Sequence, residues 1–145
     1  MNQKIISQKK TGIPKDTPYV FLERHGVKVI TESSEESVEK SFFIERMQKK
    51  SLPQWIESIL DKENAQVLLL EDYDPFPFFY RVHLKNNYGL PDANIVHIYD
   101  PSQVEEALKR SSFSPDLIIC DINMPKMTGP EFIKLVKAGK FDPNN

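Results

Sequence analysis

The chain has 145 residues, which is enough for one domain and a modest additional segment. Its formal net charge of −2 gives no electrostatic case for nucleic-acid binding, and no apolar run approaches the ~20 residues that a membrane span needs. A polar start without a signal-peptide core and a single cysteine, Cys120, argue against a secreted, disulfide-bonded protein. We therefore expect a cytoplasmic protein that neither crosses a membrane nor binds nucleic acid.

The first part of the chain, residues 1–64, carries no motif that indicates a function. Residues 1–17 are polar and contain glycine and proline, which predicts a flexible arm. Two runs with strand composition, 19–23 and 27–31, flank His25-Gly26. A short loop that ends in glycine between two such runs predicts a β-hairpin.

Two helices are predicted to follow the hairpin. The first begins at the hydroxyl and acidic residues of positions 33–36 and runs to Met47. The second ends at Leu60 and is amphipathic, which indicates docking on a core rather than a free partner-binding surface. Residues 18–64 are therefore predicted to be a small α+β segment, a hairpin plus two helices, whose function is unknown.

From Ala65 onward, apolar strand runs alternate with helical patterns. The patterns predict strands at 66–70, 94–99 and 117–120, and helices at 75–88, 103–110 and 131–137. The order β-α-β-α-β-α requires a parallel sheet with right-handed crossovers, so the predicted fold class is α/β. Residues 142–145 are predicted to be a polar tail.

Two of the predicted buried strands end in carboxylates. Glu71 and Asp72 follow the first strand, and Asp121 follows the third. The carboxyl ends of parallel strands lie on one rim of the sheet, so the three acids converge if these two strands are neighbours. Such a cluster requires a cation, and oxygen ligands favour Mg²⁺. A neutralised Asp121 is then a candidate nucleophile toward phosphorus.

A purely structural interpretation of the same acids stays open at this point. Asp72 and Asp74 are also suitable caps for the following helix, and Asp121 is suitable for an Asx turn. For Asp72 or Asp121 alone this interpretation is the better one. Because each closes an apolar strand, the pair together favours a metal site.

Three segments resemble the receiver domain of bacterial two-component response regulators. Residues 67–72 resemble the first strand of that domain with its acidic pair, and residues 116–121 resemble its third strand with the phosphoacceptor. Residues 124–129 match the Met-Pro-x-Met-x-Gly loop that follows. The resemblance implies a flavodoxin-like parallel sheet with strand order 2-1-3-4-5, in which the first and third strands are adjacent.

The resemblance also implies roles for single residues. Asp121 is expected to be the phosphorylated residue. Asp72 and Asp121 are expected to bind Mg²⁺ directly, Glu71 through a water molecule, and Asn123 through its backbone carbonyl. The phosphodonor is expected to be a histidine kinase or a histidine phosphotransfer protein.

The resemblance covers residues 65–141, about three of the five βα units of a receiver. The hydroxyl residue of the family's fourth strand and the lysine of its fifth have no counterpart in the sequence, and Lys140 lies in the tail. The third strand is then expected to have an unpaired apolar edge, which favours homodimerisation, instability or completion by another chain. The N-terminal hairpin is a less favoured cover for this edge.

The favoured function is a phosphorelay receiver that accepts a phosphoryl group from a phosphohistidine donor onto Asp121 with Mg²⁺. Such a protein is not a turnover enzyme. The alternative is a truncated, non-phosphorylated remnant that serves as an interaction or dimerisation module. A haloacid-dehalogenase-type phosphatase ranks far below both, because that family needs a second Asp two residues after the first and position 123 is Asn.

Overall fold

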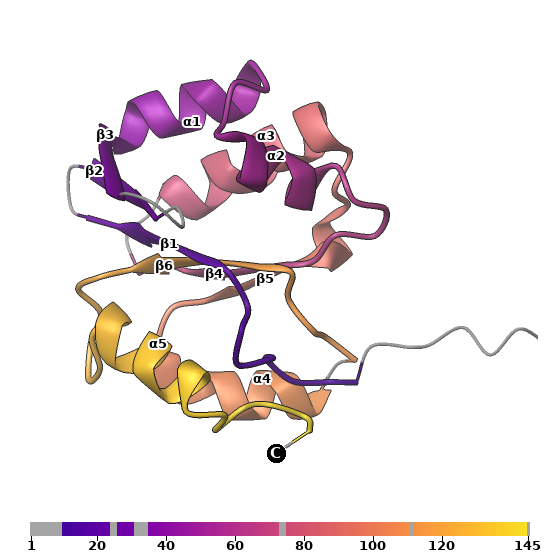
Figure 1. Ribbon diagram of the computed structural model, residues 1–145, viewed down its shortest axis with the longest axis vertical. Coiled ribbons are helices and arrows are strands. Elements are labelled where there is room, and N and C mark those ends of the chain that lie inside the picture. The colour runs from indigo at the N-terminus through magenta and orange to yellow at the C-terminus, as the bar shows by residue number, and fades with distance from the viewer. Residues whose placement is uncertain (1–9, 24–25, 31–34, 73–74, 111, 145) are drawn as a thin grey trace, which may run out of the picture.

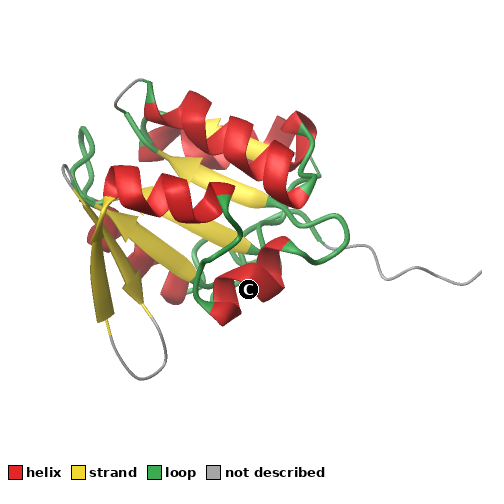
Figure 2. Ribbon diagram, turned by 90° about the horizontal axis from the view of Figure 1, so that it is seen from above, coloured by secondary structure: helices red, strands yellow, loops and turns green. Residues whose placement is uncertain are grey.

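The computed structural model describes residues 10–23, 26–30, 35–72, 75–110 and 112–144. These residues form one six-stranded sheet with helices on both faces (Figures 1 and 2). The strands are β1 (Tyr19–Leu22), β2 (Gly26–Ile30), β3 (Glu35–Glu39), β4 (Val67–Leu70), β5 (Ile95–Ile98) and β6 (Leu117–Asp121). The helices are α1 (Lys40–Gln48), α2 (Gln54–Leu60), α3 (Phe76–Tyr88), α4 (Val104–Arg110) and α5 (Gly129–Lys137), with short 3-10 turns at Asp92–Asn94 and Pro101–Gln103.

The strand order is β3-β2-β1-β6-β4-β5, and three of the neighbouring pairs are parallel. Helices α1, α2 and α3 cover one face, and α4 and α5 cover the other (Figure 1). Each face has its own apolar core, because successive residues of β4 and β6 point to opposite sides and are all buried. The α/β class with a mostly parallel sheet is therefore confirmed.

Strands β4 and β6 are direct neighbours, as the carboxylate pattern predicts. They pair in parallel, with Leu70 opposite Cys120. The residue after each of these is a carboxylate: Glu71 directly follows β4 and Asp121 is the last residue of β6, so the two lie side by side at the end of the strands. This register is what brings the acids together.

The prediction that the third strand of the receiver-like part, β6, has an unpaired edge is wrong. Strand β1 lies along that edge in parallel, with Val20 opposite Ile119 and Leu22 opposite Asp121. Val20 and Leu22 are fully buried, so the burial of their apolar surface stabilises this pairing. Since β6 has a neighbour on each side, it offers no edge for the expected homodimer.

The predicted hairpin is confirmed by the antiparallel pairing of β1 with β2. Its turn at His25 lies outside the described residues, as does the predicted helix start at 33–34. The prediction that residues 35–39 begin a helix is wrong, because they form β3, which pairs antiparallel with β2. Val38 stands opposite Val27 and packs on the core, and this tertiary contact outweighs the local helix signal.

Residues 10–17 are packed against the domain, so the prediction of a flexible arm is wrong for this part. Ile13 is fully buried and donates its backbone N–H to the carbonyl oxygen of Phe141 at 2.8 Å. Gly12 has a φ of +143°, and a Cβ there would collide with the backbone of Phe141. In the predicted tail, the Asp142 carboxylate accepts a hydrogen bond from the backbone N–H of Lys15 at 3.1 Å. The predicted arm therefore contacts both the core and the tail.

Within the described part of the chain, none of the helices combines the length and the apolarity that crossing a bilayer requires.

Candidate functional site

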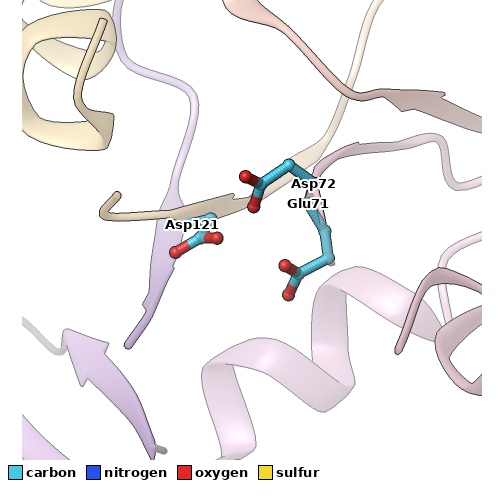
Figure 3. A group of neighbouring side chains, drawn as sticks. All are labelled: Glu71, Asp72 and Asp121. Carbon is cyan, nitrogen blue, oxygen red and sulfur yellow. The ribbon is translucent and has the colours of Figure 1, made fainter. Parts of the chain in front are cut away.

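Three carboxylates meet at the carboxyl ends of β4 and β6 (Figure 3). One carboxylate oxygen from each of Glu71, Asp72 and Asp121 lies within 4.8 Å of the other two. Glu71 is fully buried, Asp121 is 7% exposed and Asp72 is open to solvent. The structure thus brings together all three acids that the sequence singles out. The Glu71 side of this group is buried, and the Asp72 side faces solvent.

Asp121 is held in a position where its charged form is disfavoured. Burial, the hydrogen-bonded carboxyl of Asp72 and the nearby charge of Glu71 together raise the pKa of Asp121 to about 7. The backbone N–H of Asn123 donates to Asp121 Oδ1 at 3.2 Å and acts in the opposite direction, as does the charge of Lys40. Burial, followed by the charges of Glu71 and Asp121, raises the pKa of the Tyr80 hydroxyl. The site therefore has a concentrated negative field that a cation would relieve.

The local structure at Asp121 contains the predicted Asx-type contact as well as the acidic cluster. Asn123 is exposed, two residues beyond Asp121, and its N–H makes that contact. Asp74, the predicted helix cap, lies outside the described residues. Cys120 is fully buried, and burial raises the pKa of its thiol, which agrees with a core residue rather than a reactive one.

The loop between Asp121 and α5 folds back against the end of β6. The N–H of Gly129 donates to the carbonyl oxygen of Ile122 at 2.7 Å. A Cβ on Gly129 would collide with the backbone carbonyl of Asp121. Thr128 caps the helix in a reciprocal capping box with Glu131. The glycine of the loop motif thus permits the close approach that fixes the backbone of Asp121.

Gly129→Ala is expected to lower the free energy of unfolding by about 1–3 kcal/mol, because the added methyl group forces the β6 end and α5 apart. Chemical denaturation measures this change. The matched control is Lys134→Ala, an exposed position on the same helix, which is expected to stay within about 0.5 kcal/mol. Equal stability of the two variants would contradict the close contact.

The raised pKa of Asp121 predicts a pH-dependent stability. The folded state binds this proton more tightly than the unfolded state, whose pKa is near 3.8, so the contribution of Asp121 to stability falls as pH rises from about 4 to about 7. Denaturation of the wild type and of Asp121→Asn at several pH values isolates this contribution. The two should be alike near pH 4, and the variant should be the more stable above pH 7. A difference that does not vary with pH would contradict the raised pKa.

The described residues also hold a cation that the sequence analysis missed. Lys40 is 4% exposed, and its Nζ lies 3.0 Å from Glu71 Oε2. A signal was present: Lys40 shares the spacing i, i+3, i+4, i+7 with the buried residues Phe43, Ile44 and Met47, which places it on the inner face of α1.

Comparison with known proteins gives one similarity to a signalling protein. A stretch of 80 residues, 54% of the chain, is 34% identical to histidine kinase P4 of Formosa agariphila. This stretch corresponds to 5% of the length of that kinase. No family model matches the chain, and no solved structure matches it.

Proposed function

We propose that the chain is a phosphorelay receiver whose Asp121 accepts a phosphoryl group from a phosphohistidine donor. The observation that carries this proposal is the convergence of three carboxylates from neighbouring strands within 4.8 Å. Asp72, Asp121 and the backbone carbonyl of Asn123 would hold Mg²⁺, with Glu71 acting through a water molecule. Three clustered acids of mixed exposure are a ligand set of the kind that Mg²⁺ prefers.

In the proposed transfer, an oxygen of Asp121 forms a bond to phosphorus while the bond from phosphorus to the donor imidazole nitrogen breaks. The product is an aspartyl phosphate and a neutral histidine. When bound, Mg²⁺ supplies compensation for the negative charge of the transferring group. The chain itself contributes the position of Asp121, which the β4–β6 register and the contact with Gly129 set. A single transfer of this kind makes the chain a phosphoprotein rather than a turnover enzyme.

Two further observations support this proposal. Strands β5, β4, β6 and β1 lie in this order and are mutually parallel, which agrees with the first four positions of a flavodoxin-like sheet, 2-1-3-4. The similarity to a histidine kinase agrees with a two-component system, whose kinase or a histidine phosphotransfer protein would be the partner. We also propose a cytoplasmic location, since the one cysteine is a buried free thiol.

A second candidate function is an interaction module that keeps the fold without accepting phosphate. One observation favours it: β1, the strand beside Asp121, ends at Leu22 and is followed by Glu23, and neither residue supplies the hydroxyl that the receiver family has there. Direct phosphorylation separates the two candidates. The chain is incubated with acetyl phosphate and either Mg²⁺ or EDTA, and its intact mass is recorded. One added phosphoryl group that depends on Mg²⁺ supports the receiver, whereas an unchanged mass together with undetectable Mg²⁺ binding supports the module.

A further inference from the structure

Lys40 is a buried cation at the base of the acidic cluster, contributed by the part of the chain to which the sequence assigns no function. It is the first residue of α1, directly after β3. Its ammonium group lies 3.0 Å from Glu71 Oε2 and 4.5 Å from the centre of the Phe76 ring. The two side chains of this ion pair are both more than nine-tenths buried, so each is the other's compensation for the loss of water.

The charge of Lys40 acts on Asp121 as well as on Glu71. It lowers the pKa of Asp121, against the larger effects that raise it. With Lys40 counted, the group of three acids has a net charge of two negatives rather than three when all are ionised. A divalent ion that approaches Asp72 and Asp121 therefore meets a fixed positive charge nearby, and such a charge weakens cation binding.

We propose that Lys40 is a resident counter-cation that competes with the divalent ion for Glu71 and thereby keeps the affinity of the site low. The inference rests on the proposed function, because it concerns the same carboxylates. In this arrangement Lys40 is a positioning residue: it contacts Glu71 and acts on the metal through it. Because Lys40 belongs to α1, the N-terminal segment sets how readily the site takes up its ion.

Titration calorimetry with Mg²⁺ alone, without a phosphodonor, tests this inference. Lys40→Met is expected to bind Mg²⁺ at least about tenfold more tightly than the wild type, because Glu71 no longer pairs with Lys40 and is free to interact with the ion. Glu71→Gln is expected to bind more weakly, because Lys40 then faces Asp72 and Asp121 without its partner. Combining the two changes removes one charge of each sign and is expected to restore an affinity near that of the wild type.

The matched control is Lys85→Met, which removes the same charge from an exposed position on α3 and is expected to leave the affinity unchanged. A purely structural role for Lys40 predicts altered melting but no gain in affinity, so an equal or weaker affinity of Lys40→Met overturns the inference. If Lys40→Met does not fold, the comparison of Glu71→Gln with the double variant decides: the double variant must bind about tenfold more tightly. Binding by the wild type with no difference among variants overturns only the role of Lys40, whereas no binding by any variant counts against the metal site itself.

Discussion

Asp121→Asn is expected to abolish phosphoryl uptake from acetyl phosphate. An amide oxygen is a poor nucleophile and has no negative charge with which to hold Mg²⁺, so both requirements of the transfer are lost. The shape of the side chain is nearly unchanged, and the contact from the N–H of Asn123 remains available to its oxygen. The measurement is the intact mass of the protein after incubation with the donor and Mg²⁺.

A measurement of the stability of this variant separates loss of the adduct by unfolding from loss of the phosphoacceptor. Burial and the neighbouring acids disfavour the charged form of Asp121, so its neutral amide should raise the free energy of unfolding above pH 7, by about 1 kcal/mol or more. Asp92→Asn, at an exposed carboxylate remote in sequence from the cluster, is the matched control and should be phosphorylated like the wild type. An undiminished adduct on Asp121→Asn would remove this residue from the chemistry.

Removal of residues 1–64 is expected to prevent the remainder of the chain from folding as a monomer. Strand β1 covers one side of β6, and ten buried apolar side chains of this segment belong to the core cluster: Val20, Leu22, Val27, Val29, Phe43, Ile44, Met47, Leu52, Ile56 and Leu60. Each fully buried side chain of this kind contributes about 1.5–3 kcal/mol. Without them, the apolar residues of β4, β6 and α3 that they cover would face water.

Circular dichroism and size-exclusion chromatography of the fragment 65–145 measure this effect beside the full chain. We expect no cooperative melt and extensive association. A point variant gives a graded version of the test: Leu22→Ala should cost about 2–5 kcal/mol, whereas Lys28→Ala on the partly exposed side of β2 should cost less than about 1 kcal/mol. A sharp, concentration-independent melt of the fragment would show that the receiver-like part folds without β1.

The convergence of the acids was predictable because it depends on local patterns and one general rule. Both β4 and β6 are short apolar runs; a carboxylate directly follows β4 and another ends β6, and parallel neighbours place such ends on the same rim. The resemblance of residues 67–72, 116–121 and 124–129 to a receiver domain then implied that the two strands are neighbours. Each of these features spans only a few consecutive residues, so a single sequence was enough to identify them.

The partner of β6 was not predictable in the same way. The pairing of Val20 with Ile119 joins residues that lie about a hundred positions apart, and the alternation of β1 fits a hairpin edge as well as an inner strand. Strand β3 was not predicted for a similar reason, since its pairing with β2 outweighs a sequence that locally favours a helix. Lys40 was missed because its role arises only when β3 and α1 carry it to Glu71.

The most direct test of the central claim is to locate the phosphoryl group on the chain. Borohydride reduction converts an aspartyl phosphate to homoserine, which peptide mass spectrometry assigns to a single position. After incubation with acetyl phosphate and Mg²⁺, we predict the converted residue at position 121 and its absence when EDTA replaces Mg²⁺. Conversion at another carboxylate, or equal conversion without the metal, would contradict the account of three converging acids that hold an ion and present Asp121 to phosphorus.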